Sequence, residues 1–267
     1  RLAATAACAN GRLHREAAHL VSLAAEVDLV SKVELSLAPE AMDGSAAGVA
    51  WAGHYEAAGE ASSDFWGVYP LQGGQVMVLI GDAVGMELAG ALVSAVAKSC
   101  ADTLLNAVPA GMDPGQLLTA LNRSLYQPSR PSQTSCFALL LDAQAGKAYY
   151  SNAGHPIPYQ LRSDGSRLGA LVGAGPVLGD TENTTYKVST LNFAAGDSFV
   201  LFSDGLLKSR NPQGQQFRER QLQKLLAAQA GNGVQAVRDN IVTANAQHRG
   251  GTPPSDDQAL VVIARQA

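Results

Sequence analysis

The sequence contains little charge and no excess of positive charge. Charged residues make up 16% of its 267 residues, and the formal net charge is −4. A surface built for nucleic acid or for an anionic membrane needs clustered Lys and Arg, and no such cluster is present. We therefore expect no nucleic-acid partner.

Cysteine is also scarce, which argues against a disulfide framework or a common zinc motif. The three cysteines, Cys8, Cys100 and Cys136, are far apart and show no CxxC spacing. We interpret them as small apolar packing residues in a reducing compartment. The histidines are equally scattered, without an HExxH pattern. No uninterrupted apolar run approaches the ~20 residues that a membrane-spanning helix needs.

The chain begins at Arg1 rather than at methionine, which suggests a piece of a longer protein. We expect a cytoplasmic protein, or the cytoplasmic domain of a larger membrane-bound or sensor-linked protein whose upstream sensor region is missing here. Hydrophobic residues make up 46% of the chain, which is enough for a large core. We predict an N-terminal linker helix within residues 1–41 and one folded domain over residues 42–267.

An apolar seam runs along the predicted N-terminal helix, residues 12–38. Glu34 interrupts the seam, and Pro39 ends the helix. Such a seam either packs on its own domain or pairs with the same helix of a second chain, and the spacing of its apolar residues suits both. The seam residues are Leu13, Leu20, Leu23, Val27, Val30 and Leu37.

The stretch around which the domain is organised is residues 76–92, VMVLIGDAVGMELAGAL. Residues 76–80 are aliphatic and uncharged, and they predict a buried strand that delivers Asp82 at its end, followed by a turn at Gly85 and a helix. A carboxylate beside a buried strand needs a neutralising partner, for which a metal ion is one candidate. The alternative is a turn aspartate that caps the helix.

The rest of the chain reads as short strands in two groups with helix pairs between them. Because the strict strand and helix alternation of a parallel sheet is absent, we predict an α+β layered fold. The strands at residues 137–141, 148–151 and 157–161 are predicted to form a meander. Further strands are predicted at residues 186–193, 198–203 and 259–264, and helices at 86–107, 113–126, 217–229 and 233–248.

Four aspartates, Asp64, Asp82, Asp204 and Asp256, occupy predicted strand ends. Antiparallel pairing can bring such ends together, and a hairpin turn at residues 71–74 places the first two close to each other. Clustered carboxylates repel unless a cation joins them, and oxygen ligands suit Mg²⁺ or Mn²⁺. Two such ions could activate a water for attack on a phosphoryl group. The alternative is that these are ordinary turn-forming aspartates.

Several ordered motifs resemble those of the PPM metal-dependent serine/threonine phosphatases, in the SpoIIE and RsbU branch. ASSDFWGVYPL (61–71) lies where that family carries a GGD motif, and the resemblance runs from about residue 30 to residue 264. The other motifs are GDAVGMELAGAL (81–92), YYSNAGHPIPYQL (149–161), FVLFSDGLLKSRNPQGQQF (199–217) and SDDQALVVI (255–263).

The resemblance implies an α-β-β-α sandwich of two antiparallel sheets flanked by helices, with two Mn²⁺ or Mg²⁺ ions at one edge. Asp82 would bridge both ions, and the backbone carbonyl of Ala83 would bind one of them. Asp204 and Asp256 would bind the other ion. The catalytic roles fall to Asp82 and Asp204.

Two further aspartates complete the site that the resemblance implies. Asp64 matches the GGD aspartate and would act directly or through a bound water, while Asp257 would support the ligands from behind. Ser62 and Ser63 replace the paired glycines of the family pattern. If those glycines supply positive φ angles, the local backbone must differ and Asp64 could be displaced.

Three other residues near these motifs have open roles. His155 suggests a general acid, but the family pattern makes it part of a structural turn, which we favour. Met86 and Glu87 depart from the glycine-flanked residue usual after Gly85. Glu87 could repel a phosphate or bind an ion through water, and we interpret it instead as part of a solvated helix face.

The resemblance implies hydrolysis of phosphoserine or phosphothreonine on a partner protein, by a water that bridges the two ions. In this branch the substrate is usually a small STAS-type antagonist of an anti-sigma factor. The alternative is a catalytically silent relative that signals by binding and dimerising. A nucleotide substrate is a weaker alternative, because neither GxxxxGK[ST] nor GxGxxG is present.

We predict that residues 12–38 make the chain a homodimer, because an exposed seam of six aliphatic residues would promote aggregation in a monomer. Light scattering should find a dimer for the intact chain. A version starting near Met42 and a Leu23→Glu, Val27→Glu, Val30→Glu variant should both be monomeric. A monomeric intact chain at tens of micromolar, or a triple variant that remains a dimer with unchanged activity, would show that the seam packs on its own domain.

Overall fold

The computed structural model describes residues 42–59, 61–85, 88–107, 112–128, 132–166 and 168–266. The predicted N-terminal helix, with its dimerisation seam, lies outside the described residues. Met86 and Glu87 also lie outside them. The helix, the domain boundary at residue 41 and the role of Glu87 therefore stay predictions.

The described residues contain two sheets in which every pair of neighbouring strands is antiparallel. Sheet A has the strand order β1-β2-β11-β10-β7-β8, and sheet B has the order β3-β4-β5-β6-β9. The strands of sheet A are β1 (Asp43–Ala46), β2 (Val49–Glu56), β7 (Tyr159–Leu161), β8 (Gly169–Ala170), β10 (Ser198–Phe202) and β11 (Gln258–Arg265). Those of sheet B are β3 (Asp64–Leu71), β4 (Gln75–Ala83), β5 (Thr134–Asp142), β6 (Lys147–Ala153) and β9 (Ser189–Asn192).

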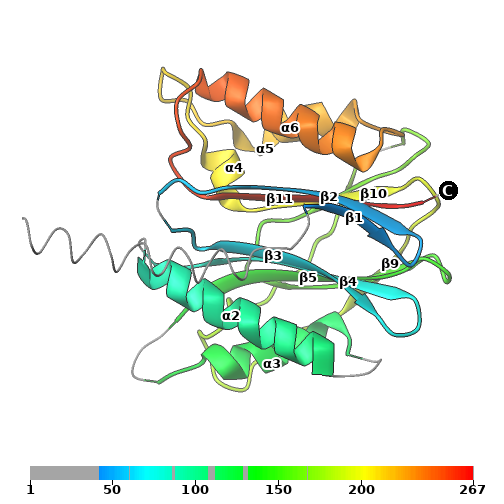
Figure 1. Cartoon of the computed structure of the whole chain (residues 1–267), viewed down its shortest axis with the longest axis vertical. Helices are drawn as coiled ribbons and strands as arrows, with labels where there is room; N and C mark the ends of the chain where they lie inside the picture. The colour runs from blue at the N-terminus through cyan, green and yellow to red at the C-terminus, as the bar shows by residue number, and fades with distance from the viewer. Residues whose placement is uncertain are drawn as a thin grey trace, which may run out of the picture.

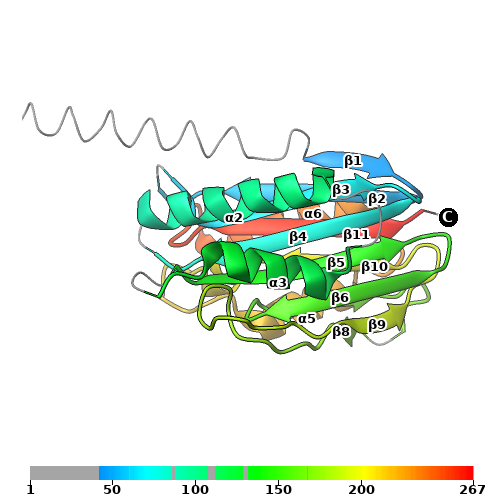
Figure 2. The ribbon, with the colours of Figure 1, turned by 90° about the horizontal axis from the view of Figure 1, so that it is seen from below.

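The helices form the two outer layers, so the domain has four layers (Figure 1). One group covers the outer face of sheet A and consists of α4 (Asp204–Lys208), α5 (Arg218–Ala227) and α6 (Val234–Arg249). The other group covers sheet B and consists of α2 (Leu88–Ala107) and α3 (Pro114–Leu125) (Figure 2). The predicted α-β-β-α sandwich is confirmed.

Both faces of the central strands are buried, which explains why they read as unbroken apolar runs. In β4, Val76, Val78 and Ile80 face sheet A, whereas Met77 and Leu79 face α2 and α3. Strand β11 alternates in the same way between the inter-sheet core and the layer under α6. This period of two fixes which side chains point between the sheets.

The structure corrects the predicted meander and adds three short elements, β1, β8 and α4. Strand β7 does not continue sheet B after β6 but crosses to sheet A, where it pairs with β10. Strand β9 returns to sheet B beside β6. A residue-by-residue pattern cannot distinguish the two sheets, because strands of both are apolar and short. The two-residue strand β8 and the one-turn helix α4 are too short to show a period.

Helix α2 is long and apolar enough, by length and composition alone, to cross a membrane. In the structure it lies on sheet B, and its buried face includes Ala97, Ala101 and Leu105, which pack in one cluster with Met77 and Leu79 of β4. These contacts are those of a core helix in a layered domain.

Candidate metal centre

Strand register brings two of the predicted aspartates together. Asp64, the first residue of β3, is the direct antiparallel partner of Asp82 in β4. Asp82 shares the face of Val76, Val78 and Ile80, so the alternation of β4 directs it toward sheet A. The prediction that both carboxylates lie at neighbouring strand ends is confirmed.

Sheet A contributes a serine that links the two sheets at this edge. Ser203 follows β10, and its hydroxyl donates a hydrogen bond to Oδ2 of Asp64 at 2.5 Å. The same hydroxyl accepts the backbone N–H of Ala259 at 2.9 Å, from the adjacent strand β11. Ser203 was not among the predicted site residues. Its position directly before Asp204 in the SDG motif was the available signal.

Asp204 and Asp256 lie nearer the surface and share one cation. The ammonium of Lys208 is 2.8 Å from Oδ1 of Asp204 and 2.8 Å from Oδ2 of Asp256. The side chains of both aspartates are about 40% exposed, whereas Asp64 is 4% exposed. Partial burial opposes the charge of Lys208, but its hydrogen bonds to the two carboxylates outweigh this effect and raise the pKa of the ammonium. Lys208 also was not predicted as part of the site.

Asp257 holds the segment that precedes β3. Its Oδ1 accepts the backbone N–H of Ala58 at 2.8 Å, and its Oδ2 accepts the N–H of Ser63 at 2.9 Å. The hydroxyl of Ser63 lies 3.3 Å from the same oxygen and 3.1 Å from Oδ1 of Asp82. Asp257 thus orients the residues around Asp64 and Asp82, and its predicted role beside metal ligands stays a prediction.

The two serines that replace the paired glycines do not need a positive φ angle. Neither Ser62 nor Ser63 has a positive φ angle. The hydroxyl of Ser62 accepts the backbone N–H of Asp64 at 3.1 Å, a short-range turn contact. The backbone at these two positions is thus one that serine adopts without strain, and the hydroxyl groups make local hydrogen bonds.

Gly205 allows α4 to approach the loop that carries the last two aspartates. A Cβ atom at this position would lie 1.9 Å from the backbone oxygen of Asp257, which is a severe clash. The glycine of the SDG motif is therefore required for close packing. It brings the helix that begins at Asp204 against the segment of Asp256 and Asp257.

Mutual repulsion and burial perturb the two inner carboxylates. Burial, followed by the charge of Asp82, raises the pKa of Asp64 well above its usual range, although the Ser203 hydrogen bond opposes the shift. Burial, followed by the charge of Asp204, raises the pKa of Asp82 to about 6. The positive charge near the two carboxylates is thus too small to keep their pKa values in the usual range.

The donor set suits a hard divalent cation. It consists of carboxylate oxygens only, and the perturbed pKa values show that added positive charge would be favourable. Among the described residues, no three acidic, histidine or cysteine side chains are close enough to hold one ion together. Asp204 and Asp256 instead close around Lys208. Ala83 is buried next to Asp82, and a ligand role for its carbonyl remains a prediction.

His155 has the contacts of a structural turn. Its backbone N–H donates to Oδ1 of Asn152 at 2.7 Å, and its carbonyl accepts from the same side chain at 2.9 Å. Nδ1 of its ring lies 2.9 Å from the hydroxyl of Ser135. Burial lowers the pKa of His155 to about 3, so the ring is neutral at physiological pH. These contacts favour the turn over a general acid.

Comparison with known proteins identifies relatives of this chain. A family model described as Stage II sporulation protein E (SpoIIE) matches residues 72–266. Phosphoserine phosphatase RsbP of Bacillus subtilis is 23% identical over 215 residues, which cover 79% of this chain and 51% of RsbP. Phosphoserine phosphatase RsbU of the same organism is 29% identical over 168 residues, covering 62% and 49%. The chain thus spans about half the length of these curated relatives.

A solved structure supports the fold. The SiaA-PP2C domain of Pseudomonas aeruginosa superimposes with a TM-score of 0.78 at 19% identity, covering 93% of this chain and 99% of that one. At this level of identity the match concerns the fold alone. It agrees with the two antiparallel sheets and the outer helices found here.

We predict that Asp82→Asn stabilises the metal-free protein. The native carboxyl of Asp82 binds its proton more tightly than the unfolded one, so the stability it contributes is present below pH 4 and is lost as pH rises through about 6. At pH 7.5 in excess chelator, the variant should gain about 1–2 kcal/mol after allowance for partial exposure, or roughly 3–6 °C in melting temperature. The fall in stability between pH 4 and 7 should be shallower than in the wild type. Thermal melts over this range measure both effects, and an unchanged or lower melting temperature at pH 7.5 would contradict the prediction.

Proposed function

The chain belongs to the SpoIIE family, and from this premise we propose that it is a metal-dependent phosphatase that hydrolyses phosphoserine or phosphothreonine on a partner protein. The observation that carries the proposal is the gathering of Asp64, Asp82, Asp204 and Asp256 at one edge of the sandwich. The names of the two curated relatives support the same reaction class.

The buried and the exposed residues of the site have different roles in the proposed reaction. Mn²⁺ or Mg²⁺ ions supply the Lewis acidity that makes water nucleophilic at neutral pH and neutralises a phosphoryl group. Asp82 interacts electrostatically with the buried Asp64 and with the outer pair, Asp204 and Asp256, so it is suited to serve both ions. Ser203 and Ser63 orient the inner carboxylates by hydrogen bonds.

The alternative function is a phosphatase-like module without activity. A silent relative has no need to keep repelling carboxylates together, because each one costs stability in the absence of a cation. The raised pKa values of Asp64 and Asp82 are signs of that cost. The site therefore favours the enzyme, and direct measurement of turnover separates the two.

We predict that turnover of a phosphoester requires Mn²⁺ or Mg²⁺. Excess chelator should abolish activity, and Asp82→Asn and Asp204→Asn should each reduce kcat by at least about 10³-fold, because each removes a charged ligand. Circular dichroism should show that both variants remain folded. Asp239→Asn, an exposed aspartate on α6, is the matched control and should retain full activity. Equal turnover in excess chelator would refute the metal-dependent mechanism.

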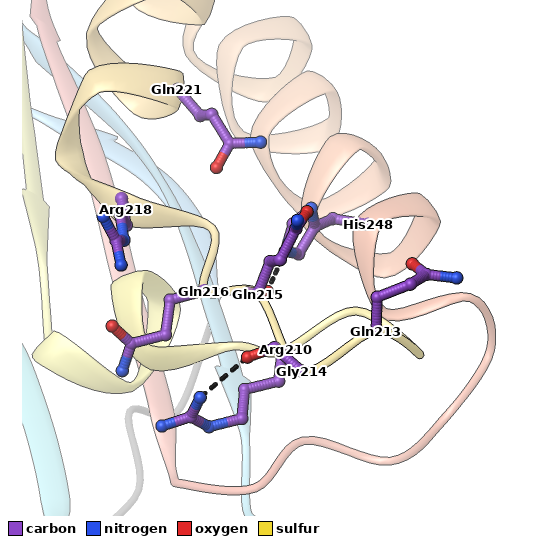
Figure 3. Close-up of a pocket in the computed structure, with 8 residues that line it drawn as sticks. All are labelled: Arg210, Gln213, Gly214, Gln215, Gln216, Arg218, Gln221 and His248. Atoms are coloured by element: carbon purple, nitrogen blue, oxygen red, sulfur yellow. Dashed lines mark hydrogen bonds between the residues drawn. The ribbon is translucent and has the colours of Figure 1, made fainter.

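Partner selectivity needs a surface outside the carboxylates, and a basic pocket formed in part by the loop after α4 is suited to this role. The cavity has a volume of about 520 Å³. Its first lining residue in the chain, Arg210, follows Lys208 by two positions. Three of its lining side chains are basic and none is acidic (Figure 3). The lining residues are Arg210, Gln213, Gly214, Gln215, Gln216, Arg218, Gln221 and His248.

The pocket has a defined shape because its loop is hydrogen-bonded. Arg210 donates to the carbonyl of Gly214 at 2.8 Å, and Nε2 of His248 lies 2.9 Å from the carbonyl of Gln215. Figure 3 shows both interactions. The absence of carboxylates among the lining residues favours an acidic segment of the phosphoprotein as occupant. We propose that this segment lies beside the phosphorylated residue.

We propose residues 169–180 as a second surface for partner selectivity, because the end of this stretch lies near the site. Leu178 forms a β-bridge with Thr134, and Thr134 is the strand partner of Ala83. The amide of Gln133 donates to Asp180 at 2.7 Å. The end of this stretch thus lies next to the strand end that carries Asp82.

For the partner itself we propose a small STAS-type antagonist of an anti-sigma factor, as the family resemblance implies. We also propose a cytoplasmic location and a homodimer formed through residues 12–38. The basic pocket and the 169–180 stretch could contact a folded partner at the same time, whereas a short peptide would reach fewer of these residues.

We predict that a folded phosphoprotein is a much better substrate than its isolated phosphopeptide, and that Arg218→Glu reduces this advantage. The variant should lower kcat/KM for the phosphoprotein about tenfold, because it places a like charge against an acidic segment. Turnover of p-nitrophenyl phosphate should not change, since this small ester does not reach the pocket.

The matched control is Arg220→Glu, which makes the same charge change on an exposed residue outside the pocket. Its kcat/KM for the phosphoprotein should stay within about twofold of the wild type. Equal effects of the two variants would indicate general electrostatic attraction rather than a docking pocket. Indistinguishable kcat/KM for protein and peptide would contradict selectivity by the surrounding surface.

A further inference from the structure

Lys208 is an internal cation within the cluster of carboxylates. It extends from the last turn of α4, four residues after Asp204 and on the same face of that helix. Its ammonium makes two contacts of 2.8 Å, one to Asp204 and one to Asp256, which lies 48 residues away in the chain. The ammonium thus joins two separate segments at the outer side of the site.

The two oxygens that bind Lys208 belong to the carboxylates assigned to the outer metal ion. Asp256 uses its other oxygen to accept the backbone N–H of Asp257 at 3.1 Å. An ion bound through Oδ1 of Asp204 and Oδ2 of Asp256 would occupy the place of the ammonium. A divalent cation and the ammonium also repel each other at such distances.

We propose that Lys208 is a tethered competitor for the outer metal position, so that a divalent cation must displace its ammonium from Asp204 and Asp256 in order to bind. The lysine keeps the two carboxylates together in the metal-free protein and lowers the affinity of the site for the ion. It is a residue that sets metal affinity and positions ligands, not a catalytic residue.

The side chain can make this exchange without disturbing the fold. It is 47% exposed, and it is attached to a flexible four-carbon stem, so the ammonium can move into solvent. The anchoring of α4 does not depend on it. Ser209 donates to Asn245 of α6 at 3.0 Å, and Gln258 of β11 donates to Ser209 at 2.7 Å.

The inference rests on the proposed function only for the presence of a metal site, so the experiment measures binding rather than turnover. Isothermal titration calorimetry with MnCl₂ compares the wild type with Lys208→Met, which keeps the side-chain length and removes the charge. We expect Mn²⁺ to bind about five- to tenfold more tightly to Lys208→Met, because two partly exposed ion pairs no longer compete. Lys208→Arg keeps the positive charge and should stay near the wild-type affinity.

The control for overall charge is Lys224→Met, on the exposed side of α5, which should leave the affinity unchanged. A second readout is the melting temperature. In excess chelator Lys208→Met should melt below the wild type, and in saturating Mn²⁺ the order should reverse. If Lys208 had only a local structural role, its replacement would lower the melting temperature equally in chelator and in Mn²⁺.

The possible results separate this inference from the proposed function. Equal Mn²⁺ affinity for the wild type and Lys208→Met would overturn the competitor role and leave the metal centre intact. Weaker binding to Lys208→Met would overturn it as well, since the lysine would then assist the bound state. Absence of Mn²⁺ binding to every variant would overturn both proposals.

Discussion

Repulsion between carboxylates that the strand register holds together is the constraint on which the site depends. Asp64 and Asp82 are direct partners across β3 and β4, so they cannot separate without breaking the pairing of two central strands. Burial prevents water from screening their charges, and their pKa values rise as a result. The free energy of strand pairing thus holds the negative charges together against their repulsion. A bound cation would remove this repulsion and stabilise the folded protein.

The structure offsets this repulsion with donors from separate elements. The hydroxyl of Ser203, directly after β10, donates a hydrogen bond to Asp64. The hydroxyl of Ser63, just before β3, lies within hydrogen-bond distance of Asp82 and Asp257. Lys208 on α4 joins the outer pair. Hydroxyl groups reduce the cost of charge without neutralising it, whereas the lysine neutralises it. The inner position therefore remains attractive to a cation, and the outer one is already partly satisfied.

One short helix, α4, connects the candidate metal centre to the proposed docking pocket. Helix α4 begins at Asp204, carries Lys208 at its end and leads directly into the loop of the basic pocket. Gly205 packs this helix against the loop of Asp257, and Ser209 ties it to α6 and β11. A partner bound at the pocket would contact the loop that follows Asp204 and Lys208. The proposed docking pocket and the candidate metal centre are therefore joined by one short helix.

The sequence by itself determined the layered α+β class and the positions of the four aspartates at strand ends, because strand period and turn residues are local signals. The motif resemblance implied that two sheets are stacked in a sandwich. It also implied the roles proposed for the metal ligands. Tertiary structure decided the rest, since strands β6 and β7 look alike in sequence yet belong to different sheets. Only the fold could reveal that Ser203 reaches Asp64 across 139 residues, or that Lys208 lies between two carboxylates. Such contacts depend on the packing of distant segments, so a local motif can mark a residue such as Ser203 but cannot identify its partner.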